Sequence, residues 1–396
     1  MAKIISIESD TGIIFESGWS DYISVASLDS THFVIVFRDR DDFAKGKVRV
    51  GSVDGTTITL GGVQTFEIGA AGTYQSVSAL DSTHFVIAWN RDGGECIAGS
   101  VAGTTITLGV SQVFDTSVCN AVKISALDST HFVISYQDVG DGQKCKVIAG
   151  KTDGDVAITI TTDSSSLFET TRSYVIPIKA LDSTHFVIAI GGYYGLYKGE
   201  VIAGKTDGDV AITIAADTSI VFENEETRDI SLTALDSTHF LIAFRDELDS
   251  EKGKVIVGKT DGDVAITITA DTGSLFESGN PVYISVSSLD STNFVIAFRD
   301  TTDSNKGKVM AGETDGDVDI SISADSASLF ESGAVKETSI SALDDTHIVI
   351  AFQDYDDGEK GKVIIGTVID APVVPANPLI GKPLISPDII KKAIIR

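Results

Sequence analysis

The phrase Leu-Asp-Ser-Thr-His-Phe contains residue types that can do chemistry, because Asp and His together bind metal ions or exchange protons. It recurs along the chain, and all six histidines occupy the same slot in it, with Asn293 as the exception. A catalytic site is needed once and should break a repeat, whereas a residue needed in every copy serves folding. Asp and Ser cap free backbone N–H groups in tight turns. We therefore expect structural turns at Asp29, Asp81, Asp128, Asp182, Asp236, Asp290 and Asp344.

A second acidic pattern, Thr-Asp-Gly-Asp, lies between the third and fourth predicted strands of several copies, for example at 152–155 and 260–263. Its carboxylates suggest a calcium loop, but the spacing of an EF-hand is absent. Asp-Gly between two strands is a hairpin signal. The sequence therefore predicts a structural hairpin here.

The segments that differ most between copies follow the second predicted strand of each copy. Six of these loops are rich in carboxylates, and Asp354, Asp356 and Asp357 supply oxygen ligands of the kind that Ca²⁺ prefers. Solvation of an acidic surface is the alternative explanation. No other metal site and no cofactor is expected.

The corresponding loop of the fourth copy lacks the acids and carries Tyr193, Tyr194 and Tyr197 instead. Exposed tyrosines offer apolar area and a hydroxyl group, which suits sugars or a protein hot spot. Trp19, in the link before the first copy, is expected to join the same ligand-binding site. Packing of the tyrosines on neighbouring loops is the alternative.

These residues are positioned by a repeat whose Leu-Asp steps are spaced by 52, 47 and then four times by 54 residues. Such a period indicates a propeller, a solenoid or an array. In the sixth copy we expect strands at 283–289, 293–299, 307–312 and 318–323, and residues 328–331 lead to the next copy. The second and third strands are continuous apolar runs, which suit sheets buried on both faces. Four-stranded sheets arranged radially make a propeller.

The two ends of the chain together supply one complete copy of the repeat. The last copy stops after three strands near residue 369, while residues 3–7 and 10–18 match the missing fourth strand and its exit. Closure of this kind removes a pair of sheet edges. The sequence therefore predicts an all-β fold over residues 1–370, a seven-bladed β-propeller of four-stranded antiparallel blades, with the N-terminal strand closing the ring.

Composition narrows the classes of partner. The formal net charge of −27 argues against nucleic-acid binding, because such a body repels phosphate backbones. The three cysteines form no disulfide framework and match no zinc spacing. The first residues show no signal-peptide pattern, and no stretch has the length of a transmembrane helix.

Residues 371–396 form a different segment, which holds five of the seven prolines together with four basic residues and one acidic residue. The segment is apolar but cannot form one regular element. We expect it to dock on a protein partner, on its own propeller or on a neighbouring subunit. A disordered leftover or a linker is the alternative.

The repeat, fullest in YISVSSLDSTNFVIAFRD followed by KGKVMAG, resembles the tandem propeller repeats of uncharacterised microbial and phage-associated surface or tail proteins. The resemblance covers residues 1–370. It implies a propeller and an extracellular-surface or virion location, without a recognisable signal peptide.

The leading functional expectation is a non-enzymatic binding or assembly module that displays variable loops on one face and is lectin-like in its multivalency. Its expected partners are a protein assembly or a surface glycan. A glycan-active hydrolase or lyase is the first alternative, but it needs a single acid–base cluster that the repeat does not show. A structural spacer docked through the C-terminal tail is the second.

Overall fold

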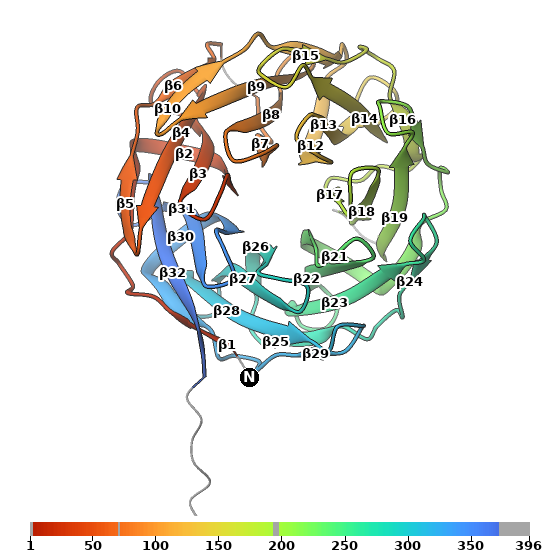
Figure 1. The fold of residues 1–396 in the computed structure, drawn as a ribbon. Coiled ribbons are helices and arrows are strands. Elements are labelled where there is room, and N and C mark those ends of the chain that lie inside the picture. Colours follow the sequence, from red (N-terminus) through yellow and green to blue (C-terminus); the bar gives the residue numbers. More distant parts are fainter. Residues whose placement is uncertain (1–2, 70–71, 193–197, 372–396) are drawn as a thin grey trace, which may run out of the picture.

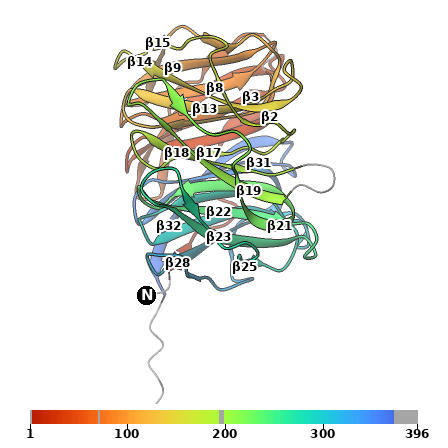
Figure 2. The ribbon, with the colours of Figure 1, turned by 90° about the vertical axis from the view of Figure 1, so that its right-hand side faces the viewer.

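The computed structural model describes residues 3–69, 72–192 and 198–371, and these residues form an all-β structure without a helix. Figure 1 shows the strands arranged in a ring around a central opening, and Figure 2 shows the ring after a quarter turn. The described part therefore contains no helix that could span a membrane. Residues 372–396 lie outside the described residues, so the docking expected of the tail stays a prediction.

Each copy of the repeat forms one unit of the ring. We number the units 1 to 7 by their leucines Leu28, Leu80, Leu127, Leu181, Leu235, Leu289 and Leu343. The innermost strand of each unit precedes this leucine and exposes every second side chain to the centre of the ring. The inner strands are β7 (Ser76–Ala79), β12 (Cys119–Ala126), β17 (Ile178–Ala180), β26 (Pro281–Ser288) and the C-terminal parts of β2 (Ile13–Ser27), β21 (Ile220–Ala234) and β30 (Ser328–Ala342).

The second strand of each unit is buried along nearly its whole length, as its continuous apolar run predicts. It pairs antiparallel with the inner strand on one side and with the third strand on the other. The second strands are β3 (His32–Asp39), β8 (His84–Asn90), β13 (His131–Asp138), β18 (His185–Ile190), β22 (His239–Asp246), β27 (Asn293–Asp300) and β31 (His347–Asp354).

The third strand carries a recurring glycine opposite the aromatic residue of the second strand. Phe33 lies opposite Gly51, and a Cβ atom on Gly51 would come within 2.3 Å of the Phe33 ring. The glycine therefore makes room for the ring. The third strands are β4 (Lys45–Asp54), β9 (Gly94–Ala102), β14 (Lys144–Thr152), β19 (Lys198–Thr206), β23 (Lys252–Thr260), β28 (Lys306–Thr314) and β32 (Lys360–Asp370).

The outer edge of each unit is made of two short segments that both pair with the third strand. One segment is β5 (Thr57–Leu60), β10 (Thr105–Leu108), β15 (Ile158–Thr159), β20 (Ile212–Thr213), β24 (Ile266–Thr267), β29 (Ile320–Ser321) or β1 (Lys3–Ser6). The other is β6 (Gln64–Glu67), β11 (Gln112–Asp115), β16 (Ser166–Glu169), β25 (Ser274–Glu277) or the N-terminal part of β21, β30 or β2.

The fourth strand predicted at 318–323 is thus too long, because only Ile320 and Ser321 pair with β28. Asp317 and Val318 are exposed, and the chain leaves the sheet here for a polar turn. The segment at 328–331, which the sequence indicated only as a connection, supplies the remaining outer pairing.

The strand predicted at the N-terminus pairs where the sequence places it. β1 runs antiparallel to the end of β32, with Lys3 opposite Asp370 and Ser6 opposite Thr367. Among the described residues, seven apolar clusters each join two neighbouring units, and one of them packs Phe15 and Phe33 against Val349 and Val363. Units 1 and 7 are therefore packed neighbours.

The repeated Leu-Asp phrase forms the predicted turn. In unit 3, Asp128 Oδ1 accepts hydrogen bonds from the Thr130 N–H (2.7 Å) and hydroxyl (2.9 Å) and from the His131 N–H (2.8 Å). The same contacts recur around the ring, with Asn293 in place of histidine in unit 6. The serine between the aspartate and the threonine is exposed, so the predicted cap is built by Asp and Thr and not by Ser.

Candidate functional site

In five units, lysines of the third strand pair with the carboxylates of the loop between the second and third strands. In unit 7, Lys360 and Lys362 both contact Asp357, and Lys362 also contacts Asp354. Asp356 accepts a hydrogen bond from the Ala334 N–H at 2.8 Å. These contacts occupy the oxygen atoms that the sequence offered for calcium, and the described residues contain no group of three or more metal-ligating side chains.

The predicted ligand-binding site stays a prediction, because the structure describes only one of its four residues. Trp19 lies on β2 and is 41% exposed, but the guanidinium group of Arg40 stacks on its ring at 4.8 Å. Tyr193, Tyr194 and Tyr197 lie outside the described residues. The strands that flank them, β18 and β19, are on the opposite side of the ring from β2 (Figure 1).

The inner strands of all seven units line a central channel with a volume of about 410 Å³. Two levels of side chains face it. The first channel row is four positions before the repeated leucine: Ser24, Ser76, Lys123, Pro177, Ser231, Ser285 and Ser339. The second channel row is two positions before it: Ala26, Ser78, Ser125, Lys179, Thr233, Ser287 and Ser341.

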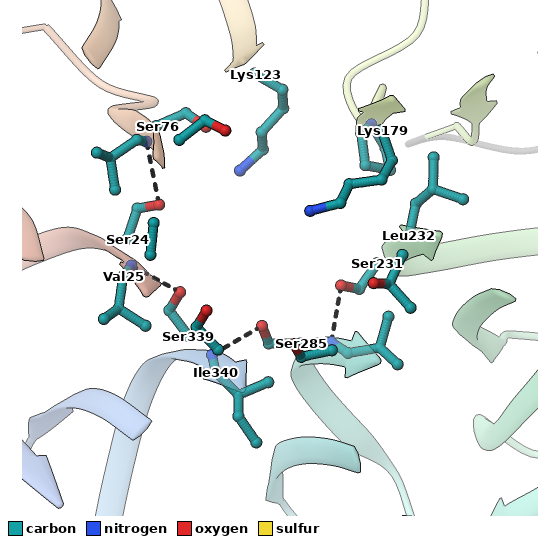
Figure 3. A pocket seen from close by; sticks show the side chains of 18 of the residues that line it. Ser24, Val25, Ser76, Lys123, Lys179, Ser231, Leu232, Ser285, Ser339 and Ile340 are labelled. Carbon is teal, nitrogen blue, oxygen red and sulfur yellow. Dashed lines mark hydrogen bonds between the residues drawn. The ribbon is translucent and has the colours of Figure 1, made fainter. Parts of the chain in front are cut away.

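The serines of the first channel row link each unit to the next. Ser285 Oγ accepts a hydrogen bond from the Ile340 N–H at 3.1 Å, and Ser339 Oγ accepts one from the Val25 N–H at 3.1 Å (Figure 3). The second bond runs from unit 7 to unit 1. Ser24, Ser76 and Ser231 do the same for their following units. The hydroxyl groups therefore satisfy N–H groups of inner strands that would otherwise face water.

The second channel row makes the same kind of hydrogen bond between units, two residues further along the inner strands. Ser125 Oγ accepts from the Ala180 N–H at 3.0 Å, and Ser341 Oγ accepts from the Ser27 N–H at 3.1 Å. Ser78, Thr233 and Ser287 make the corresponding bonds. A small hydroxyl residue at these positions is thus explained by folding alone.

Units 3 and 4 break the pattern. Lys123 replaces the first-row serine of unit 3, and Lys179 replaces the second-row serine of unit 4. Pro177 occupies the first row of unit 4, and its side chain has no oxygen atom that could accept the N–H bond of the next unit. Among the described residues, unit 4 is consequently the unit that lacks both links to its successor. A lysine at these positions does not serve the contact that its counterparts serve.

The two lysines point into the channel, and Figure 3 shows their amino groups directed toward its centre. Every other lysine that the structure describes contacts a carboxylate, an amide oxygen or an aromatic ring. Lys123 and Lys179 have no such contact within the described ranges. In a protein with a net charge of −27, two unpaired ammonium groups on neighbouring units of one channel are unusual.

Enclosure makes this arrangement costly. Water reaches Lys123 along the channel, but the surrounding walls remove much of its hydration and lower the pKa of its amino group, an effect that Glu337 partly opposes. The same loss of hydration lowers the pKa of Lys179. Both groups would regain favourable interactions if an anion entered the channel between them.

A third level of residues forms the mouth row, six positions before the repeated leucine. Tyr22, Tyr74, Asp229, Tyr283 and Glu337 belong to it, and all five have a positive φ between 49° and 65°. Such backbone is strained for residues other than glycine, and it turns their side chains at a bulge in the inner strand. The remaining members of the mouth row are Ala121 and Val175.

The mouth row combines aromatic and acidic side chains. The rings of Tyr22 and Tyr74 lie 5.8 Å apart, and Arg38 stacks on Tyr22 at 4.5 Å. Burial raises the pKa of Glu337 to about 7, with a further contribution from Asp21, although the Ile23 N–H donates to Glu337 Oε2 at 3.2 Å. One carboxyl group of the mouth thus sits near its titration midpoint at neutral pH.

Paired carboxyl groups also occur away from the channel, on the outer part of the units. Burial and contact with Asp10 raise the pKa of Glu331 to about 7, and hydrogen bonding to Glu331 lowers the pKa of Asp10 to about 2. Acid pairs of this kind occur in hydrolase sites. Here the pair recurs as Glu223 with Asp271, Glu277 with Asp325 and Glu169 with Asp217.

These acid pairs are contacts between neighbouring units. Asp271 joins unit 5 to unit 4, because its N–H donates to the Phe222 carbonyl and its carboxylate accepts from the Asn224 N–H. The other pairs use the same geometry. Their repetition indicates a structural role.

Sequence reasoning missed Lys123 and Lys179. A comparison of the seven copies could have identified them. When the seven segments are aligned on the repeated leucine, both lysines fall in columns of serine, threonine, alanine and proline. The alignment alone does not show that these columns face a channel.

No protein-family model matches the chain, and no curated protein matches it in sequence. Solved structures with a related arrangement include a protein of unknown function from Dyadobacter fermentans, with 9% identity over 94% of this chain and 98% of that one and a TM-score of 0.48. A leech intramolecular trans-sialidase complexed with 2,7-anhydro-Neu5Ac has 8% identity, coverage of 92% and 70% and a TM-score of 0.47. A prolyl endopeptidase has 10% identity, coverage of 88% and 47% and a TM-score of 0.47. At this level of similarity they assign neither an activity nor a ligand.

Proposed function

We propose that the chain is a closed seven-bladed β-propeller that acts as a non-enzymatic binding module, and that its central channel holds a small anionic ligand. Closure is supported by the pairing of β1 with β32, by the apolar cluster between units 7 and 1, and by the channel bonds from Ser339 and Ser341 to unit 1. Each unit would then be one blade.

The observation that carries the proposed function is the pair of unpaired lysines in the channel. Within the described residues neither ammonium group has an oppositely charged partner, and an anion bound in the channel would supply one. The hydroxyl groups that share the lining can donate further hydrogen bonds to anion oxygens. Because the carboxyl pairs that resemble acid–base machinery are repeated contacts between units, the channel favours binding over hydrolysis.

Titration of the intact protein with sulfate and with inorganic phosphate in low-salt buffer, followed by isothermal calorimetry, tests this function. We expect saturable binding by the natural chain. Lys123→Met or Lys179→Met should weaken it at least about tenfold, which corresponds to about 1.4 kcal/mol, and the double variant should abolish it. Methionine keeps the length of the side chain and removes only its charge.

Lys151→Met is the matched control, because Lys151 carries the same charge but pairs with Asp209 at the outside of the ring. It should leave anion binding unchanged. The two channel variants should also melt at a temperature equal to or above that of the natural chain, since they remove an uncompensated charge. Anion binding that persists in the double variant, or that the natural chain never shows, would refute the proposed function.

A further inference from the structure

The channel is chemically asymmetric, and this asymmetry specifies more than a charge. The ammonium groups belong to units 3 and 4, which lie on one side of the ring (Figure 3). The first channel row presents serine hydroxyl groups on the remaining arc, from Ser231, Ser285 and Ser339 to Ser24 and Ser76. A ligand that fills the channel therefore meets cations on one side and hydroxyl groups on the other.

The first-row hydroxyl groups have unused hydrogen-bonding capacity. Each of these five serines accepts one N–H bond from the next unit, and none donates its own proton to another described residue. A serine hydroxyl has one proton and two lone pairs. Each therefore keeps a donor and a lone pair for the contents of the channel, which matches ligand hydroxyl groups that both donate and accept.

The second channel row differs in this respect. Ser125 and Ser287 donate weakly to neighbouring carbonyl groups, at 3.4 Å and 3.5 Å, and Thr233 contacts Ser288 at 3.4 Å. The level with five available hydroxyl groups is therefore the first row, which is also the level of Lys123. Lys179 lies one step further along the channel.

The mouth row adds aromatic residues two positions before the first row, beside the residues that line the cavity. Tyr22 and Tyr74 present neighbouring rings, and Tyr283 is backed by Arg299 at 4.9 Å. Aromatic rings pack against the C–H faces of sugars and offer hydroxyl groups at their edges. A cavity of about 410 Å³ is in the range of sites for organic ligands, whereas a bare inorganic anion would use only the lysines.

Resting on the proposed function, we propose that the channel ligand is an acidic sugar, whose anionic group lies between Lys123 and Lys179 and whose hydroxyl groups face the first-row serines. Carboxylated and phosphorylated sugars share this chemistry. Glucuronate and glucose 6-phosphate are suitable probes, because they pair a similar ring with different anionic groups.

Calorimetric titrations with glucuronate, glucose 6-phosphate, acetate and glucose separate charge from hydroxyl groups. We expect at least one of the two acidic sugars to bind about tenfold or more tightly than acetate, and glucose to show no measurable binding. Preference between the acidic sugars would identify the anionic group. Both should lose binding in the Lys123→Met/Lys179→Met variant.

Substitution of the serines tests the hydroxyl contacts directly. Ser285→Ala should reduce the affinity for the preferred acidic sugar about tenfold while leaving the affinity for acetate unchanged. Ser328→Ala is the matched control, because Ser328 also links two neighbouring units, through a hydrogen bond that its hydroxyl group donates to the Ile5 carbonyl at 3.0 Å, but lies at the outer edge of the ring and away from the channel. It should retain the preference, and thermal melting of both variants confirms that each is folded.

The outcomes distinguish the two proposals. Equal affinities for acetate, sulfate and the acidic sugars would leave the anion site standing and overturn the acidic sugar as its ligand. Equal effects of Ser285→Ala and Ser328→Ala would overturn it as well. Absence of binding to every anion, sulfate included, would overturn both proposals.

Discussion

The melting temperature of this protein is expected to fall by several degrees as the pH rises from about 5 to about 8. The cause is the set of buried glutamates Glu223, Glu277, Glu331 and Glu337. Burial raises the pKa of each to about 7, and the first three each face an aspartate of the neighbouring unit. One oxygen atom of Glu223 and one of Glu331 are buried without a hydrogen-bond partner other than these carboxyl groups. A proton shared within each pair resolves the repulsion.

The sign of the effect follows from proton linkage. In the unfolded chain these glutamates titrate near pH 4.5, so between about pH 4.5 and 7 the folded protein holds protons that the unfolded chain has lost. The stabilisation is complete below the unfolded pKa and is lost as the pH rises through about 7. Asp10 and Asp271, whose pKa falls to about 2 through contact with Glu331 and Glu223, act in the opposite sense only below about pH 4.

Replacement of the three paired glutamates by glutamine tests this assignment, because an amide keeps a donor for the aspartate and cannot ionise. The triple variant Glu223→Gln/Glu277→Gln/Glu331→Gln should show a much weaker decline in melting temperature between pH 5 and 8, measured by circular dichroism. Glu225→Gln, an exposed change on the same strand as Glu223, should follow the natural chain. Since Glu337 contributes to both curves, the difference between variants is the informative quantity, and parallel curves would refute the shared protons.

Much of the fold could be predicted from the sequence, because the same pattern of turn and strand residues occurs in all seven copies of the repeat. The turn at Asp128, the buried second strands and the pairing of β1 with β32 each follow from residue types that recur at fixed spacing. The short outer strands could not be predicted in detail, because residues 318–323 alternate like a strand although only two of them find partners. Alternation of apolar and polar residues indicates a preference for the strand conformation. It does not show that a partner strand is present along the whole segment.

The candidate site was less accessible to sequence reasoning. The sequence predicts a ligand site at Tyr193, Tyr194 and Tyr197, because variable loops on a repeated scaffold often bind ligands, and this stays a prediction. The departures at Lys123 and Lys179 lie within the inner strands, where a charged residue between apolar ones also fits an ordinary solvent-facing position. Only the ring arrangement shows that the exposed face of these strands is the wall of a channel.

The number of carboxylates in the acidic loops suggests metal binding, but the lysines that pair with these carboxylates lie outside the loop motif. Asp354 and Asp357 suggested calcium, yet Lys360 and Lys362 follow at the positions that contact them. The same arrangement joins Asp39 and Asp42 to the lysines of β4. When the lysines of the following strand are included, the loop sequence predicts a turn whose carboxylates form ion pairs.

Ile5→Asp is expected to be among the most destabilising single changes outside the channel. Ile5 is 7% exposed and packs in the apolar cluster between units 6 and 7, and β1 completes the outer edge of unit 7 opposite β32. A carboxylate at this position would be buried without a partner, which costs about 3–5 kcal/mol. Release of β1 would also leave the end of β32 as an open edge.

Ile4→Asp is the matched control, because Ile4 is the adjacent residue of the same strand, is 41% exposed and pairs with Ile369. Its cost should be about 1 kcal/mol or less, mainly from the weaker strand preference of aspartate. The free energies of unfolding of the two variants, measured in urea, distinguish the cost of burying a charge from the cost of placing a charge anywhere in β1. If β1 closes the ring, Ile5→Asp should also expose residues 3–6 and 367–370 to limited proteolysis, whereas Ile4→Asp should leave them as resistant as in the natural chain. Equal stability of the two variants would mean that β1 contributes little to unit 7, and the proposed closure would then rest only on the contacts between units 7 and 1.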